Sequence, residues 1–160
     1  GSIASDPGAS LVVWASWLVP ADTPLMVIAE NDDEATAAAR VFARVGLDGT
    51  CAYLQGGIRA WQEAGLPLAQ MRWSGLDSSI PVIDVRSRSE FEEGSVEGAR
   101  HIFLGELPER LDELPPRDQP VSLLCRTGDR STVAASVLER AGFTDIRNIA
   151  GGMTALKMNQ

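Results

Sequence analysis

The segment LLCRTGDRSTVAASVLERAGF, residues 123–143, places a cysteine between an apolar strand and an Ala-rich helix. Cys125 is followed at once by Arg126 and, five positions along, by Arg130. A strand that ends at the carboxyl edge of a parallel sheet brings its last residues to the place where ligands gather. A helix that starts there directs its free N–H groups and dipole at the same place, which favours negative charge. The segment therefore predicts that Cys125 is held as a nucleophilic thiolate.

The residues that follow Cys125 form the predicted binding loop. Gly128 allows a turn that a side chain would obstruct, and successive backbone N–H groups could form a cradle around the sulfur. We expect Arg130 to hold the loop or an anion through a forked contact, and Arg126 to point outward and steer anions. The alternative is a buried structural cysteine, which would not need two arginines and a helix end beside it. The predicted loop comprises Arg126, Thr127, Gly128, Asp129, Arg130 and Ser131.

Composition restricts the classes of function that remain. The chain has 160 residues and a net charge of -8, which argues against nucleic-acid binding and against anionic membrane surfaces. The longest apolar run, LMVIA, is far too short to span a bilayer. With two cysteines and a single histidine, His101, the chain lacks a metal-binding cluster, so we expect no metal and no cofactor. Two cysteines also do not form a disulfide framework, which favours reduced thiols in a cytoplasmic protein.

The sequence repeats itself. Residues 24–47 align with 120–143 without a gap, and 53–61 match 148–156 after a slip of one residue. Each copy reads as a buried strand, a polar turn, an Ala-rich helix, a second strand, a Gly-Gly turn and a further helix. Two copies of a strand–helix–strand–helix unit predict an α/β fold with a parallel sheet in each copy.

The second copy has additional elements in front of it. A buried strand is predicted over 80–87, followed by a short helix over 88–94. A further helix is predicted over 106–116, where two prolines end it. With these elements, residues 80–160 form a complete domain.

The first copy lacks a counterpart of the strand over 80–87, so residues 1–65 are predicted to be an incomplete module joined by a linker, 66–79. Its first helix, LVVWASWLVP, is apolar almost all round, which predicts burial. Ala29 stands at the position that aligns with Cys125, and ENDDE follows it. A methyl group cannot hold sulfur and the carboxylates would repel an anion, so we expect this module to be catalytically inactive. Cys51 is interpreted as a small buried apolar residue rather than a second reactive thiol.

Three motifs of the second copy resemble those of the rhodanese-like family. CRTGDRS fits the pattern C-x-x-G-x-R-S, VIDVRSRSEFEEGSVEGARHI resembles the opening segment of the family, and IAGGMTAL resembles its closing Gly-Gly motif. The resemblance covers residues 80–157 and implies a three-layer rhodanese-like fold, here in tandem with a truncated first copy. Ser95 and Leu156 stand where the family usually has histidine and tryptophan, departures that we expect to affect packing more than activity.

The resemblance implies a sulfurtransferase. Cys125 would attack the outer sulfur of a small anionic donor, either thiosulfate or a low-molecular-weight persulfide, and would hold that sulfur as a persulfide. An acceptor such as cyanide or a thiol would then remove it. Asp84 and Arg86 would give structural support. Asp84 could accept hydrogen bonds from groups of the loop, but a surface-capping role is favoured. Glu90 belongs to the scaffold, and His101 is interpreted as structural rather than as a general acid or base.

Other activities fit the loop less well. Thiolate-dependent phosphatases use a similar cradle with the spacing C-x5-R, whereas Cys125 and Arg130 have the spacing C-x4-R. A tetrahedral phosphate needs a wider ring of donors than this loop offers, which disfavours a phosphatase or an arsenate reductase. A non-catalytic rhodanese-like module that binds a partner or senses oxidation is the other alternative, and turnover distinguishes it from an enzyme.

The tandem also resembles the C-terminal part of bacterial fusions in which a metallo-β-lactamase-fold hydrolase or persulfide dioxygenase precedes two rhodanese-like modules. The resemblance implies a longer natural protein with a metallo-β-lactamase-fold domain as a possible partner. The helix that carries Trp14 and Trp17 would leave an apolar face for something to cover, so a homodimer is the other expectation.

Overall fold

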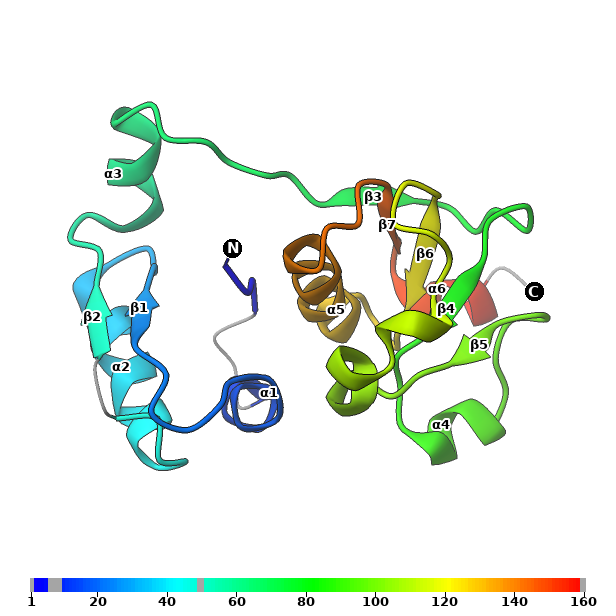
Figure 1. Cartoon of the computed structure of the whole chain (residues 1–160), viewed down its shortest axis with the longest axis horizontal. Helices are drawn as coiled ribbons and strands as arrows, with labels where there is room; N and C mark the ends of the chain where they lie inside the picture. The colour runs from blue at the N-terminus through cyan, green and yellow to red at the C-terminus, as the bar shows by residue number, and fades with distance from the viewer. Residues whose placement is uncertain (1, 6–9, 49–50, 159–160) are drawn as a thin grey trace. The chain divides into compact units, whose positions relative to one another are not determined.

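The computed structural model describes residues 2–5, 10–48 and 51–158, and it divides into two compact units (Figure 1). The C-terminal unit comprises Met71–Gln160 together with Gly1–Ser5, and the N-terminal unit comprises Asp6–Gln70. Each unit has its own parallel sheet.

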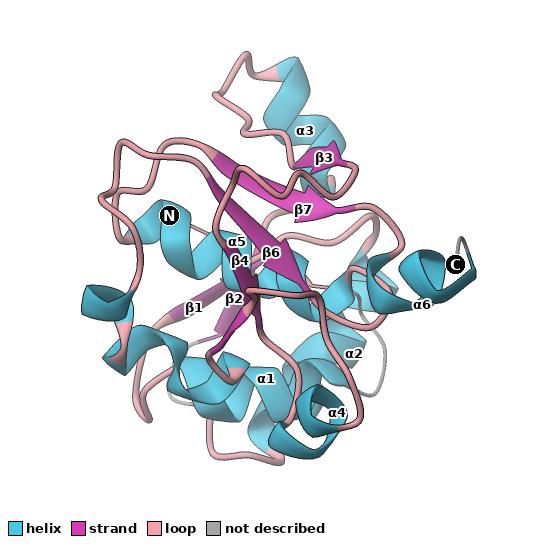
Figure 2. Cartoon of the chain, turned by 90° about the vertical axis from the view of Figure 1, so that its right-hand side faces the viewer, coloured by secondary structure: helices cyan, strands magenta, loops and turns pink. Residues whose placement is uncertain are grey.

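The C-terminal unit is built on a five-stranded sheet in the order β3-β7-β6-β4-β5, in which every neighbouring pair is parallel. Figure 2 shows β3, β7 and β6 side by side. The strands β4 and β6 are buried along their whole length and mostly apolar, as expected where both faces of a parallel sheet are covered. This confirms the predicted α/β fold with a parallel sheet. The strands are β3 (Arg72–Ser74), β4 (Val82–Asp84), β5 (Arg100–His101), β6 (Val121–Leu124) and β7 (Ile146–Ile149).

Helices cover both faces of this sheet, and Figure 1 shows α5 and α6 on opposite sides of the strands. On the α6 side, Met153 packs in a cluster with Val82, Leu124 and Ile149. On the other side, α5 buries Val133, Ala134 and Leu138 among its apolar residues. The helices are α4 (Arg88–Glu92), α5 (Asp129–Arg140) and α6 (Gly152–Met158), with two 3-10 helices, η1 (Leu104–Glu109) and η2 (Leu111–Glu113).

Two local predictions differ from the structure. The single helix predicted over 106–116 is wrong, because η1 and η2 are separate 3-10 turns. Pro108 lies inside η1, and a proline there has no N–H and would clash with the preceding turn of an α-helix. Within the predicted linker 66–79, Arg72–Ser74 forms β3 and pairs in parallel with β7. Three residues with one apolar side chain are too short a run for a periodic strand pattern.

The N-terminal unit contains a two-stranded parallel sheet, β1 with β2. The helix α1, predicted to be buried, is only partly so, because Trp14 and Ala15 are its buried residues whereas Trp17 is 42% exposed. The side chain of Cys51 lies outside the described part of the chain, so the prediction for this residue stays a prediction. The elements are α1 (Ser10–Leu18), β1 (Leu25–Val27), α2 (Asp32–Ala43), β2 (Cys51–Tyr53) and α3 (Gly57–Glu63).

Over residues 2–5, 10–48 and 51–158, no helix has the length and apolar character needed to cross a membrane. The same residues contain no group of three or more His, Cys, Asp or Glu side chains placed to hold a metal ion.

The first turn of α6 touches the chain that follows β6. Gly151 and Gly152 have φ angles of 68° and 55°, in the left-handed region that glycine adopts without a Cβ penalty. A Cβ atom on Gly152 would collide with the carbonyl oxygen of Cys125 and would lie 2.7 Å from that of Arg126. The predicted Gly-Gly turn is thus a point of close backbone approach between α6 and the loop after β6.

We predict that Gly152→Ala destabilises the C-terminal unit by about 2–5 kcal/mol, the sum of a left-handed alanine and an overpacked contact. Gly98→Ala is the matched control, because Gly98 has a φ of 75° with nothing within 4 Å of its Cβ position. The control should lose about 1 kcal/mol. Urea unfolding of the purified variants measures both values, and equal losses would contradict the close approach at Gly152.

Candidate active site

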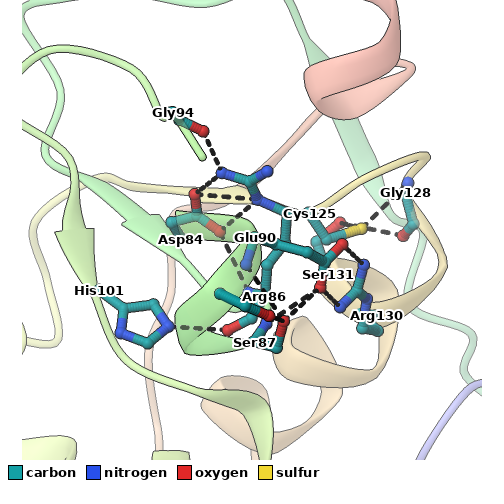
Figure 3. A network of polar contacts seen from close by, with 11 residues as sticks. Asp84, Arg86, Ser87, Glu90, Gly94, His101, Cys125, Gly128, Arg130 and Ser131 are labelled. Atoms are coloured by element: carbon teal, nitrogen blue, oxygen red, sulfur yellow. Dashed lines mark hydrogen bonds and ion pairs between the residues drawn. The ribbon is translucent and has the colours of Figure 1, made fainter. Parts of the chain in front are cut away.

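Cys125 lies where β6 ends and the loop to α5 begins, at the carboxyl edge of the sheet (Figure 3). Its side chain is buried, with the residue only 1% exposed. The sulfur, Sγ, accepts a hydrogen bond from the backbone N–H of Gly128 at 3.1 Å. The hydroxyl of Ser131 lies 3.3 Å from the same sulfur. The sulfur is therefore enclosed by its own loop. A reacting group has to approach it past the exposed residues of the loop, Arg126, Thr127 and Asp129, which we call the rim.

Helix α6 fixes the backbone on either side of the thiol. The N–H of Met153 donates to the carbonyl of Cys125 at 2.9 Å, and the N–H of Thr154 donates to the carbonyl of Arg126 at 3.0 Å. In a planar trans peptide the C=O and the following N–H point in opposite directions. The N–H groups of Arg126 and Thr127 consequently point away from α6, and the first peptides of the loop cannot turn over.

Helix α5 presents its N-terminus to the sulfur. Gly128 is the N-cap, with a φ of 125°, and no side chain caps the helix. The N–H of Thr132 donates to the Gly128 carbonyl at 2.9 Å, which is the first hydrogen bond of the helix. The N–H groups from Asp129 to Ser131 therefore lie at the open end of the helix, where the dipole is positive. This end of α5 favours negative charge on the sulfur or on a group bound beside it.

Asn148, on β7, contacts the loop from the interior of the domain and was not among the residues predicted from the sequence. It is fully buried, and its Nδ2 donates to the Gly128 carbonyl at 3.2 Å and to Thr132 Oγ1 at 3.1 Å. The Ser131 hydroxyl contacts its Oδ1 at 2.6 Å. A buried polar residue in an apolar strand must find partners, so an asparagine within the strand that precedes the Gly-Gly turn was an available signal.

The Ser131 hydroxyl has three acceptors within reach but only one proton. Its oxygen lies 2.6 Å from Asn148 Oδ1, 3.0 Å from the Gly128 carbonyl and 3.3 Å from Cys125 Sγ. The short contact with Asn148 is the geometry of a good O–H···O hydrogen bond, whereas the sulfur contact is longer. Rotation of the hydroxyl can bring this proton to the sulfur when the sulfur carries more negative charge.

Arg130 makes a forked contact, but with Glu90 on α4 and not with the loop or an anion as its position had led us to expect. The two guanidinium nitrogens lie 2.6 and 2.7 Å from the two carboxylate oxygens. This hydrogen-bonded guanidinium holds the pKa of Glu90 at about 2, well below the usual 4.5 of a glutamate. The Glu90 carboxylate raises the pKa of Arg130, and the nearby Cys125 adds to that effect more weakly. Arg130 thus links α5 to α4, and both of its terminal guanidinium nitrogens are hydrogen-bonded to Glu90.

Asp84 and Arg86 form a buried ion pair at the end of β4. Arg86 donates through Nε at 2.9 Å and through Nη2 at 2.6 Å, and Ser95 Oγ donates to Asp84 at 2.6 Å. Arg86 also donates to the Gly94 carbonyl at 2.8 Å. The surface-capping role expected for Asp84 is wrong, because its side chain is fully buried. A buried pair is stable when its remaining hydrogen-bonding capacity is filled, and here Ser95 and Gly94 contribute to filling it.

His101 is held by neighbours of this ion pair. Its Nε2 lies 2.8 Å from the carbonyl oxygen of Arg86, and its ring stacks on Phe91 with the centroids 4.8 Å apart. Both contacts fix the orientation of the imidazole within the scaffold, which is the structural role that the sequence suggested for it.

The outer face of the loop is polar. Arg126, Thr127 and Asp129 are exposed, and Thr127 Oγ1 donates to Asp129 Oδ2 at 2.9 Å. In the described part of the chain, Arg126 forms no ion pair with a carboxylate. Arg126 is thus exposed beside Cys125, as its position in the sequence predicted, and its role in steering anions stays a prediction.

Glu90→Gln should lower the free energy of unfolding by about 1–2 kcal/mol at pH 7, since the ion pair is hydrogen-bonded but partly open to solvent. A carboxyl group with a depressed folded-state pKa stabilises above its unfolded pKa of 4.5, and the effect fades as the pH falls toward about 2. The difference between wild type and Glu90→Gln should therefore shrink between pH 6 and pH 3, measured by urea unfolding.

The control for this prediction is Glu92→Gln, which removes the exposed pair that Glu92 forms with Arg88 on the same helix. We expect a change within about 0.5 kcal/mol and little dependence on pH. If the free energy of unfolding lost in Glu90→Gln stays constant down to pH 3, the stabilising role given to the charge of Glu90 is contradicted.

Comparisons with known proteins concern the C-terminal unit. A sequence model described as the rhodanese-like domain matches residues 68–159. Thiosulfate sulfurtransferase PspE of Escherichia coli is 34% identical over 87 residues, covering 50% of this chain and 83% of PspE. YqhL of Bacillus subtilis is 45% identical over 71 residues, covering 44% of this chain and 56% of YqhL. The chain spans about half the length of the Bacillus subtilis relatives YrkF and YqhL, with 41% and 56% covered.

A solved structure of a rhodanese-related protein from Thermoplasma volcanium is 30% identical, with a TM-score of 0.46, and the match covers 50% of this chain and 78% of that one.

Proposed function

The chain belongs to the rhodanese-like domain family, and from that premise we propose that it is a sulfurtransferase that carries a sulfane sulfur on Cys125. One observation supports the proposal above the others: the sulfur accepts the N–H of Gly128 at the open end of α5. Relatives such as PspE, whose name is thiosulfate sulfurtransferase, support this class of enzyme for the family. The substrates proposed are a small anionic donor and a thiol or cyanide acceptor.

In the loading step, the Cys125 thiolate attacks the outer sulfur of the donor. With thiosulfate, the new S–S bond forms as the donor S–S bond breaks, and sulfite leaves with the bonding electron pair. The charge of the persulfide then lies on the transferred sulfur. The Gly128 N–H, the open N-terminus of α5 and the Ser131 hydroxyl are placed to stabilise that charge. Arg126 attracts the anionic donor to the rim of the loop.

In the transfer step, the acceptor attacks the outer sulfur of the persulfide. Cyanide takes the sulfur as thiocyanate, the persulfide S–S bond breaks, and the electron pair returns to the Cys125 thiolate. The same groups that stabilised the loaded sulfur now stabilise the leaving thiolate, so one loop serves both halves of the cycle. No cofactor is needed, because the cysteine changes only its bond to sulfur.

A phosphatase is less well supported by the site. Its arginine would have to direct both guanidinium nitrogens at the anion, whereas the fork of Arg130 is occupied by Glu90. The spacing from Cys125 to Arg130 is also one residue shorter than C-x5-R. A non-catalytic binding or redox-sensing module would preserve the thiol but would show no turnover, and that difference is measurable.

Treatment with thiosulfate should add roughly 32 Da, one sulfur atom, to the intact mass of the protein. Cyanide should remove the added mass with release of thiocyanate, and reduction should remove it as well. Cys125→Ser should gain no mass, because a serine hydroxyl is not ionised at neutral pH and is a poor nucleophile toward sulfur. Intact-protein mass spectrometry measures each of these mass changes. An adduct of equal size on Cys125→Ser, or none on wild type with either thiosulfate or a persulfide, would contradict the proposal.

We also propose that the N-terminal unit is an inactive rhodanese-like module. Its order β1–α2–β2–α3 repeats the order β6–α5–β7–α6 of the C-terminal unit. Gly56 and Gly57 have φ angles of 77° and 57°, close to those of the Gly-Gly pair at the start of α6. A Cβ atom on Gly57 would collide with the carbonyl of Ala29, as one on Gly152 would with that of Cys125. Ala29 therefore occupies the position of the nucleophile.

The inactive module should not recover sulfur uptake when a thiol is restored. We expect the double variant Cys125→Ser, Ala29→Cys to gain no sulfur from thiosulfate, because the acidic turn that follows Ala29 repels the donor and supplies no cation. Peptide mapping by mass spectrometry locates any adduct and distinguishes position 29 from Cys51. Uptake at position 29 at a rate comparable with that of wild-type Cys125 would show that the inactivity rests on the missing thiol alone.

A further inference from the structure

A tryptophan from the edge strand packs against the loop that holds the sulfur. A Cβ atom on Gly128 would lie 2.9 Å from both Cη2 and Cζ3 of Trp73, so the six-membered ring of the indole rests on the Gly128 backbone. Gly128 is the residue whose N–H contacts Cys125 Sγ at 3.1 Å. Only Gly128 therefore separates the indole of Trp73 from the sulfur of Cys125.

The register of the sheet sets this position. Trp73 is the partner of Asn148 in the parallel pair β3–β7. Paired residues on neighbouring strands point to the same face of a sheet, and Asn148 Nδ2 binds the Gly128 carbonyl. Trp73 and Asn148 thus hold Gly128 from the same face, one through an apolar surface and the other through a hydrogen bond. The glycine is required at this position because any side chain would meet the indole.

Trp73 is far more exposed to solvent than a core residue. Half of it (51%) is exposed, whereas Cys125 beneath the rim is 1% exposed. The indole therefore keeps a large apolar surface next to the approach to the sulfur, with the charged Arg126 elsewhere on the exposed part of the loop. A molecule that reaches Cys125 and carries carbon atoms can bury this surface, with a gain that scales with the apolar area removed from water.

We propose that Trp73 is a specificity-determining residue that selects organic persulfides, R–S–SH, over thiosulfate as sulfur donors; the inference rests on the proposed sulfur transfer at Cys125. The Cys125 thiolate attacks the outer sulfur, the donor S–S bond breaks, and R–S⁻ leaves with the bonding electron pair while the transferred sulfur keeps its proton. The carbon chain of R packs on the exposed indole during this step. Thiosulfate has no carbon, so it gains nothing from this surface and depends on charge alone.

The test compares two donors on wild type, two variants of Trp73 and one control variant. Second-order rate constants for sulfur loading are measured by intact mass with glutathione persulfide and with thiosulfate, for wild type, Trp73→Ala and Trp73→Phe. We expect Trp73→Ala to lose about tenfold with the persulfide and to stay within about twofold with thiosulfate, while Trp73→Phe keeps most of the persulfide rate. Met158→Ala, which truncates a residue that is 81% exposed at the end of α6, is the control and should change neither rate.

The outcomes separate the two proposals. Equal losses of the loading rate with both donors would mean that Trp73 only supports the loop. An unchanged persulfide rate in Trp73→Ala would mean that the donor does not touch the indole. Either result overturns the inference about Trp73 and leaves the sulfurtransferase proposal standing. Wild type that loads from neither donor would overturn both. Urea unfolding midpoints for each variant establish that the rates compare folded proteins.

Discussion

The candidate site depends on the contact between the first turn of α6 and the carbonyl oxygens of Cys125 and Arg126. Two backbone N–H groups of α6 bind these oxygens at 2.9 and 3.0 Å, and Gly152 lets the two segments approach. Because the two peptides are fixed, the loop has to cross from β6 to α5 in one conformation, with the Gly128 N–H directed at the sulfur. In the proposed mechanism, anion recognition therefore depends on backbone geometry before it depends on any side chain.

The charged side chains around the site stabilise that geometry, and most of them are neutralised by partners. Glu90 forms an ion pair with Arg130. Asp84 and Arg86 form a buried ion pair that is further hydrogen-bonded to the hydroxyl of Ser95 and the carbonyl of Gly94. The open end of α5 and the exposed Arg126 are the groups that we propose attract an anion to the loop. In a chain with a net charge of -8, these features make a small positive region on an otherwise acidic protein.

The sequence predicted the site at the level of the backbone. A thiol between an apolar strand and an Ala-rich helix implied the carboxyl edge of a parallel sheet, and the glycines marked the turns, because these signals are local in the chain. Contacts between distant segments were not predictable in the same way. The pairing of Arg130 with Glu90 spans 40 residues, and the burial of Asp84 depends on Ser95, which the sequence suggested only as a packing change.

The least predictable residue of the site was Trp73. It lies in a three-residue strand inside a segment that reads as a linker, and only its pairing with β7 brings it to Gly128. Asn148 was missed for a related reason, since a single polar residue in a short strand carries no periodic signal. For Trp73 the information resides in the order of strands in the sheet, which one sequence does not specify, whereas an asparagine in an apolar strand signals a need for partners without identifying them.

The most direct test of the account is a crystal structure of the chain after reaction with thiosulfate. We predict electron density for one additional sulfur bonded to Cys125 Sγ, directed into the loop and within hydrogen-bonding distance of backbone N–H groups between residues 126 and 131. Density that shows the outer sulfur rotated away from these N–H groups, with the loop opened and the hydrogen bonds to α6 broken, would contradict it.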